Sequence, residues 1–174
     1  MQPYKPSDVI EYHDVFNEFD HESICREMDA GFWKYGHQSD MSKKEIPFWL
    51  MSLSQNKFFS EYLLNKIESI TGSNYNFERV YANGHTYGMK GSPHQDSYNH
   101  SGRTFLYYPF KWNVEWGGKT CFKFQTDTGV KYHFVTPEPN KAILFPGIIP
   151  HWAEETSRVF TGLRISIAWK LELK

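Results

Sequence analysis

The chain has 174 residues, of which 40% are hydrophobic and 18% aromatic, and its formal net charge is −1. This length suits one compact domain with a sizeable core and argues against two. The balanced charge gives no strong field toward nucleic acid or an anionic membrane, and no apolar run reaches the roughly 20 residues of a membrane span. The opening MQPYKPSDVIEYHD lacks the basic and apolar regions of a secretory signal. We therefore expect a cytoplasmic protein with no nucleic-acid or membrane partner.

Helical patterns are found in residues 1–75. Asp20 is expected to cap a helix that ends near residue 29. A second helix is expected over about 57–71, where apolar residues recur at helical spacing and a glycine follows the last turn. The stretch over 31–49 is rich in aromatic residues but has no repeating period. We expect it to form an ordered loop that covers the mouth of a pocket.

From residue 77 onward the pattern changes to short β-type runs separated by Gly, Pro or Asn. Strands are expected near 77–82, 104–110, 119–124, 130–135, 141–145 and 163–171. Helices followed by many short strands, without βαβ alternation, predict a β-rich α+β fold. The expected architecture is a double-stranded β-helix, or jelly roll, with the N-terminal helices packed outside. We expect one domain over 1–174, with a helical flank at 1–75 and a catalytic core at 76–174.

The stretch SPHQD places a histidine and an aspartate two positions apart, at His94 and Asp96. In extended backbone, alternate side chains share a face, so these two can chelate one metal ion. His151, in FPGIIPHW, is the candidate third ligand from another strand. Two imidazoles and one carboxylate form the facial triad of non-haem Fe(II) oxygenases. The helical HExxH pattern of zinc hydrolases is absent, which favours iron.

The C-terminal strand carries an arginine at its start. Alternation places Arg164, Ser166 and Ala168 on one face and Ile165, Ile167 and Trp169 on the other. A guanidinium fixed on a strand is a suitable bidentate anchor for a dicarboxylate. Arg158 is a rival anchor, but its loop position is more typical of a solvated charge. The histidines His85, His100 and His133 are interpreted as turn or surface residues.

Three segments together resemble one enzyme family. YANGHTYGMKGSPHQD is similar to a Tyr-x-x-Gly stretch leading into HxD, RTFLYYPFKWNVEWGGKTCFKF resembles a strand, Trp and Gly-Gly hairpin, and HWAEETSRVFTGLRISIAW resembles a distal His with an anchoring Arg. In this order, they resemble the Fe(II)/2-oxoglutarate-dependent dioxygenase superfamily, in particular its prolyl 4-hydroxylase-like branch. The resemblance covers roughly the last 95 residues of the chain.

The resemblance implies a role for each matching residue. His94, Asp96 and His151 would bind Fe(II), and Arg164 would pair with the distal carboxylate of 2-oxoglutarate. Tyr107 would hydrogen-bond the same carboxylate, and Tyr81 would line the cosubstrate pocket. Trp169, as core or as substrate wall, and Tyr87 are candidates for contact with substrate. Molecular oxygen would be the second cosubstrate, and ascorbate a reductant for the iron.

The implied activity is hydroxylation of a C–H bond, with a prolyl residue of a protein or peptide as the first candidate substrate. A small-molecule or nucleobase oxygenase of the same superfamily is an alternative. A non-catalytic jelly-roll module that binds a structural or non-redox metal is another. A cupin-type enzyme is less favoured, because its first motif normally carries more histidines than His94 alone.

Overall fold

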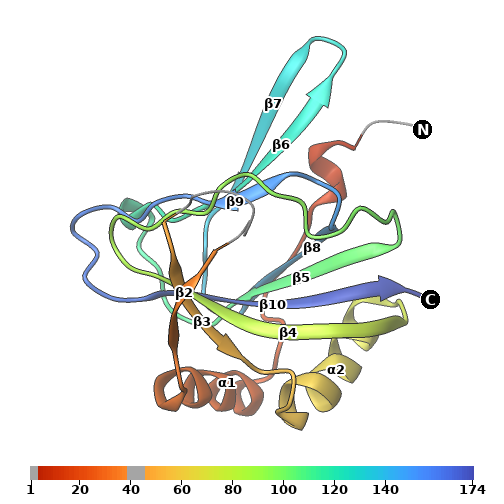
Figure 1. The fold of residues 1–174 in the computed structure, drawn as a ribbon. Coiled ribbons are helices and arrows are strands. Elements are labelled where there is room, and N and C mark those ends of the chain that lie inside the picture. Colours follow the sequence, from red (N-terminus) through yellow and green to blue (C-terminus); the bar gives the residue numbers. More distant parts are fainter. Residues whose placement is uncertain (1–3, 39–45) are drawn as a thin grey trace.

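A computed structural model describes residues 4–38 and 46–174 of the chain (Figure 1). Its α-helices are α1 (Glu18–Ala30) and α2 (Leu63–Thr71), and a π-helical turn at Phe58–Tyr62 leads directly into α2. Short 3₁₀ turns lie at Pro6–Asp8 and Val114–Trp116. The strands are β1 (Ile10–Tyr12), β2 (Lys34–His37), β3 (Phe48–Ser52), β4 (Tyr75–His85), β5 (Gly102–Tyr108), β6 (Thr120–Thr126), β7 (Gly129–Val135), β8 (Lys141–Pro146), β9 (His151–Ala153) and β10 (Arg164–Leu173).

These strands form two antiparallel sheets. The larger has the order β1-β8-β5-β10-β4-β3-β2, and the smaller has the order β7-β6-β9. Non-consecutive strands are neighbours in both sheets, as the predicted double-stranded β-helix requires. Helices α1 and α2 lie together on one side of the larger sheet (Figure 1). The expected fold class is therefore confirmed.

The N-terminal part of the chain contains more strand than expected. Strand β1 pairs with β8 at one edge of the larger sheet, and β3 pairs with β4 toward the other. The aromatic stretch at 31–49 forms β2 and the start of β3, so its interpretation as a loop was wrong; its residues 39–45 lie outside the described part. Strands of three to five residues have too little alternation to be recognised alone and depend on pairing with longer neighbours. From this pairing we infer that flank and jelly roll form a single domain.

The first helix begins three residues earlier than expected. Its cap is Asn17, whose side chain accepts a hydrogen bond from the backbone N of Asp20 at 2.9 Å. The carboxylate of Asp20 is instead fully buried and receives Lys66 Nζ at 2.5 Å and the hydroxyl of Tyr62 at 3.1 Å. Asp20 thus joins α1 to the second helical segment. The end of α2 follows expectation, because Gly72 adopts a left-handed conformation with φ of 65°.

Strand β10 separates the two cores of the molecule. Ile165, Ile167 and Trp169 face the helices, within a cluster that includes Ile24, Met28, Phe59 and Leu63. The opposite face of β10 is directed at the space between the sheets, where Leu106, Phe122 and Phe145 belong to a second cluster. The alternation predicted for this strand is confirmed. It determines which side chains can reach the site.

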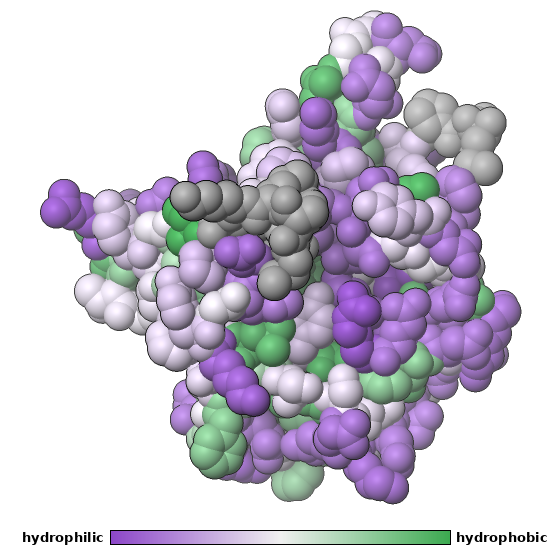
Figure 2. Space-filling model, viewed as in Figure 1, coloured by the Kyte–Doolittle hydropathy of each residue, from purple (hydrophilic) through white to green (hydrophobic). Residues whose placement is uncertain are grey.

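The surface is predominantly hydrophilic on the face shown in Figure 2, with hydrophobic residues in small groups between polar ones. The hairpin of β6 and β7 projects from the body of the molecule (Figure 1). No helix within residues 4–38 and 46–174 is both long enough and apolar enough to cross a membrane.

Candidate metal centre and adjoining cavity

A cavity of about 440 Å³ opens between the two sheets. Strand β4 lines it with Tyr81, Asn83 and His85, and β10 lines it with Arg164, Ser166, Ala168 and Lys170. The predicted metal ligands His94, Asp96 and His151 lie in its wall. Two sequence segments more than 50 residues apart therefore meet in the wall of one cavity.

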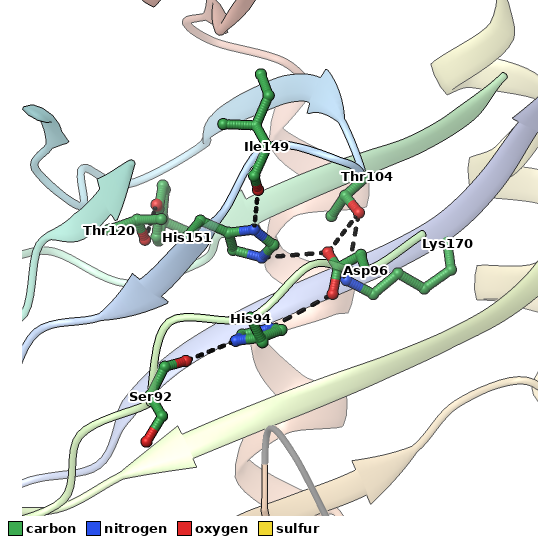
Figure 3. A network of polar contacts seen from close by, with 9 residues as sticks. Ser92, His94, Asp96, Thr104, Thr120, Ile149, His151 and Lys170 are labelled. Carbon is green, nitrogen blue, oxygen red and sulfur yellow. Dashed lines mark hydrogen bonds and ion pairs between the residues drawn. The ribbon is translucent and has the colours of Figure 1, made fainter. Parts of the chain in front are cut away.

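The three predicted ligands converge on one point. Each offers one donor atom, and these atoms lie within 4.8 Å of one another. His94 and His151 are held side by side by two backbone hydrogen bonds, of 3.1 and 2.9 Å, that pair their main chains. The Nε2 atoms of His94 and His151 lie 3.4 and 3.2 Å from the Asp96 carboxylate. Figure 3 shows both imidazoles pointing at this carboxylate.

The hydrogen bonds of the two histidines select the tautomer that a metal needs. Nδ1 of His94 lies 2.8 Å from the carbonyl oxygen of Ser92, and Nδ1 of His151 lies 2.9 Å from that of Ile149 (Figure 3). A carbonyl can only accept, so each Nδ1 carries the proton and each Nε2 presents a lone pair to the centre. Burial lowers the pKa of His151, against the attraction of Asp96, which keeps this ligand neutral. The donor set therefore fits a divalent transition metal such as Fe(II).

Lys170 and Thr104 support the carboxylate of Asp96, and neither was identified from the sequence. The hydroxyl of Thr104 donates to Oδ2 of Asp96 at 2.6 Å, and the Lys170 ammonium donates to the same oxygen (Figure 3). Burial raises the pKa of Asp96, but Lys170 and His151 outweigh it and hold this pKa well below its usual range. Burial lowers the pKa of Lys170, yet the attraction of Asp96 raises it overall. Extending the alternation of β10 by one step would have identified Lys170.

Arg164 lies in the same cavity and is only 1% exposed. Its Nε donates to the carbonyl of Gly118 at 2.5 Å, and its terminal NH₂ donates to the hydroxyl of Thr120 at 3.1 Å. Among residues 4–38 and 46–174, no carboxylate lies within 4.0 Å of the Arg164 guanidinium, the limit for an ion pair. Glu154 attracts this guanidinium from farther away. A buried guanidinium without a carboxylate partner is costly unless an anion binds there.

The tyrosine beside Arg164 is Tyr108, so the prediction for Tyr107 was wrong. Tyr108 donates to Thr120 at 2.7 Å, and its ring centre lies 5.8 Å from the Arg164 guanidinium carbon. Tyr107 points to the opposite face of β5, where its hydroxyl contacts His21 at 2.6 Å and Asn140 at 3.1 Å. Because side chains alternate along a strand, an error of one position moves the hydroxyl to the face of β5 opposite Arg164.

Of the remaining predicted site residues, one lines the cavity and the others lie outside its lining. Tyr81 lines the cavity, 5.7 Å from the Lys170 ammonium. Trp169 is fully buried on the helix side of β10, where its Nε1 donates to the carbonyl of Phe59 at 2.9 Å, so it forms no substrate wall. Tyr87 is 52% exposed and does not line the cavity. Arg158, the rival anchor, also lies outside the cavity lining, in an exposed position.

His85 was interpreted as a surface or turn residue, but it is 3% exposed and lines the cavity. It stands directly opposite Arg164 in the β4–β10 pairing and stacks on Phe48 with ring centres 4.5 Å apart. Neither of its ring nitrogens has a hydrogen-bond partner, and the same is true of the Asn83 side-chain oxygen. Burial, together with Arg164, lowers the pKa of His85 to about 3. These unpaired atoms provide hydrogen-bonding capacity that a bound ligand could use.

Sequence comparison identifies no relative. No protein-family model matches the chain, and no curated protein sequence matches it either.

Comparison with solved structures gives strong matches at low identity. A 2OG-Fe(II) oxygenase family oxidoreductase from Burkholderia pseudomallei is 9% identical, with a TM-score of 0.72, over 96% of this chain and 86% of that one. A prolyl hydroxylase from Trichoplax adhaerens, in complex with a hypoxia inducible factor peptide fragment, is 13% identical, with a TM-score of 0.72, over 96% and 84%. HygX from Streptomyces hygroscopicus, with nickel, 2-oxoglutarate and hygromycin B bound, is 11% identical, with a TM-score of 0.65, over 95% and 82%. The chain thus has the fold of the 2OG-Fe(II) oxygenases.

Proposed function

We propose that the protein is an Fe(II)- and 2-oxoglutarate-dependent oxygenase that hydroxylates a C–H bond. The observation that carries this proposal is the presence, in one cavity, of a preorganised His-Asp-His triad and a buried arginine, Arg164, that has no carboxylate partner among residues 4–38 and 46–174. A structural metal site would account for the triad but would leave Arg164 without a counter-charge. The shared fold with 2OG-Fe(II) oxygenases supports the same conclusion.

Each residue of the site has a defined task in this proposal. Nε2 of His94, the carboxylate of Asp96 and Nε2 of His151 would hold the iron. Arg164 would bind the distal carboxylate of 2-oxoglutarate, and Tyr108 would assist it. Tyr81 would contact the cosubstrate nearer the metal. When bound, Fe(II) and 2-oxoglutarate would supply electrons that activate molecular oxygen, which is the oxidant, and ascorbate would keep the metal reduced.

The chain itself contributes orientation and a dry environment. The hydrogen bonds to Ser92 and Ile149 fix both imidazole rings, so the metal ligands need no reorganisation when the ion binds. Leu106, Phe145 and Ala168 add an apolar lining to the cavity, which limits water near the reacting atoms. Proton transfer by a side chain is not required for this chemistry, and we assign none.

For the substrate, we propose a prolyl residue of a protein or peptide. The sequence resemblance to the prolyl 4-hydroxylase-like branch and the fold shared with the peptide-bound Trichoplax adhaerens enzyme support this choice. A small-molecule substrate is the second candidate, because the similar structures include HygX with hygromycin B bound. Both candidates use the same metal and cosubstrate sites.

The first test is succinate formation from 2-oxoglutarate by purified protein with Fe(II) and ascorbate. We expect slow succinate formation without substrate, lost by about 100-fold or more in His151→Ala because a metal ligand is removed. The matched control is His100→Ala, which removes a histidine outside the cavity lining and should leave the rate unchanged. Arg164→Met should retain metal but weaken 2-oxoglutarate binding. Absence of both succinate formation and 2-oxoglutarate binding in the unmodified protein would overturn the proposal.

A further inference from the structure

We propose that the substrate carries a carboxylate group and that Arg79, at the side of the cavity, binds it. This inference rests on the proposed oxygenase function and adds a substrate class to it. Arg79 is exposed, yet it belongs to the cavity lining together with the metal ligands. It therefore combines access from solvent with a position beside the reacting centre.

The register of the sheet places Arg79 close to the metal ligands. Arg79 on β4 stands directly opposite Lys170 on β10, and Lys170 donates to the metal ligand Asp96. Residues directly opposite on one face of an antiparallel pair have Cβ atoms about 4.5–5.5 Å apart. A group bound by Arg79 would thus lie in the same cavity as the metal ligands, on the side where Lys170 contacts Asp96.

Among residues 4–38 and 46–174, the Arg79 guanidinium has no carboxylate partner. It lies over the ring of Tyr81, whose centre is 5.9 Å from the guanidinium carbon. No described carboxylate lies within 4.0 Å of it. By contrast, Lys170 is paired with Asp96, and Arg164 is assigned to the distal carboxylate of 2-oxoglutarate. Within the described lining, Arg79 is therefore the cation that neither the metal site nor the proposed cosubstrate would pair.

The charge of the whole cavity supports an anionic substrate. Its described lining includes three permanent cations, Arg79, Arg164 and Lys170, but a single carboxylate, that of Asp96. The charges of Fe(II) and of the 2-oxoglutarate dianion cancel, so their binding leaves this excess of positive charge in place. A neutral substrate closing over Arg79 would remove water from the guanidinium without replacing its hydrogen bonds, which is unfavourable. A carboxylate supplies both the charge and the hydrogen bonds.

A carboxylate fits the site better than a phosphate. The guanidinium of Arg79 can form two parallel hydrogen bonds with one carboxylate. The neighbouring His37 adds no second cation, because burial, reinforced by Arg79, lowers its pKa. A phosphate with nearly two negative charges would normally require more than one cationic donor. The carboxylate could be the substrate's own terminal group or the side chain of an acidic residue next to the hydroxylated position.

The test compares acids with their amides. One pair is N-acetyl-proline and N-acetyl-prolinamide, which represents a terminal carboxylate. The other is a blocked Pro-Glu dipeptide and its Pro-Gln counterpart, which represents an acidic side chain. Stimulation of succinate formation is measured for the unmodified protein and for Arg79→Gln and Arg79→Lys. Arg158→Gln is the matched control, because it removes an exposed arginine outside the cavity lining.

We expect the acid of at least one pair to stimulate turnover more than its amide, and Arg79→Gln to raise its KM about 10- to 100-fold, as for loss of a charge-assisted hydrogen bond. Arg79→Lys should restore part of this loss, and Arg158→Gln should change neither the KM nor substrate-free succinate formation. Ligand-observed NMR with the Zn(II)-loaded protein, which does not turn over, should show the same preference for the acid. Equal responses to acid and amide, no effect of Arg79→Gln, or no binding of either acid would overturn carboxylate recognition. Loss of succinate formation with the NMR preference intact would contradict only the oxygenase function.

Discussion

The ammonium group of Lys170 and the carboxylate of Asp96 form a buried ion pair within the candidate metal centre. Both side chains are less than 10% exposed, and both contact the hydroxyl of Thr104. The negative charge of Asp96 is therefore balanced by protein before any metal arrives. A bound ion would share the carboxylate with Lys170, so this lysine should affect both folding and metal binding.

The first prediction concerns Lys170→Met, which keeps the length of the side chain but removes its charge. Without metal, Asp96 would be left as a buried carboxylate without its cation, and we expect a loss of about 3–5 kcal/mol in the free energy of unfolding. Mn(II) or Zn(II) would supply the missing positive charge. Metal should then stabilise the variant more than it stabilises the unmodified protein, as measured by urea denaturation with and without the ion.

Lys141→Met is the matched control for this experiment. Lys141 is also a buried lysine, 4% exposed, paired with Glu11 at 2.7 Å and Glu138 at 2.8 Å, and it does not line the cavity. Its removal should destabilise the protein without increasing the response to metal. A metal response in Lys170→Met no larger than in Lys141→Met would show that Lys170 does not act through Asp96.

The second prediction distinguishes the two adjacent tyrosines of β5. Tyr108→Phe removes the hydroxyl beside Arg164 and should weaken 2-oxoglutarate binding by about 3- to 10-fold, as for one hydrogen bond. Tyr107→Phe removes contacts with His21 and Asn140 on the other face. It should lower the free energy of unfolding by about 1–3 kcal/mol and leave 2-oxoglutarate affinity unchanged. Calorimetric titration of both variants with 2-oxoglutarate measures the affinities. A greater loss of affinity in Tyr107→Phe than in Tyr108→Phe would show that Tyr107 is the tyrosine that assists cosubstrate binding.

The tyrosines illustrate why the sequence predicted some parts of the site better than others. Strand β10 is ten residues long, and its regular alternation correctly separates Arg164 from Trp169. The run FLYY of β5 is apolar or aromatic at every position because both faces of that strand are buried. Such a strand gives no pattern from which to assign a face. Only the pairing with β10 and β8 decides which tyrosine lies beside Arg164.

The burial of His85 was also beyond what the sequence could show. His85 follows a glycine at the end of β4, in a context typical of a turn. What buries it is Phe48 of β3, a strand that was itself not predicted, and Arg164 from across the sheet. The candidate metal ligands were easier to identify, because HxD spacing and a distal histidine are set by the chemistry of the ion and not by the packing around it.

The third prediction uses the lowered pKa of His85. This histidine has a pKa of about 3 in the folded protein, compared with an ordinary value of 6.5. The unfolded chain therefore binds a proton that the folded protein does not, and stability falls as the pH decreases from 6.5 toward 3. At pH 5 the loss due to His85 should be about 2 kcal/mol relative to its value above pH 6.5.

His85→Phe removes this titration while keeping a ring against Phe48. Urea denaturation at pH 7 and pH 5 should show a smaller loss of stability in His85→Phe than in the unmodified protein, by about 2 kcal/mol. His100→Phe, a substitution outside the cavity lining, is the control and should retain the original pH dependence. If His85→Phe and the unmodified protein lost the same unfolding free energy between pH 7 and pH 5, protonation of His85 would not destabilise the folded protein.

The last prediction separates the tryptophan of the core from the tryptophan of the cavity. Trp169→Phe removes the hydrogen bond to Phe59 and part of a fully buried ring, and should cost about 1–3 kcal/mol of unfolding free energy. Its effect on kcat/KM for an identified substrate should be small, because the side chain faces the helices. Trp152→Phe alters a residue of the cavity lining and should change substrate kinetics more than stability. Urea denaturation and steady-state kinetics of both variants provide the measurement. A larger change in kcat/KM for Trp169→Phe than for Trp152→Phe would indicate that Trp169 contacts the substrate.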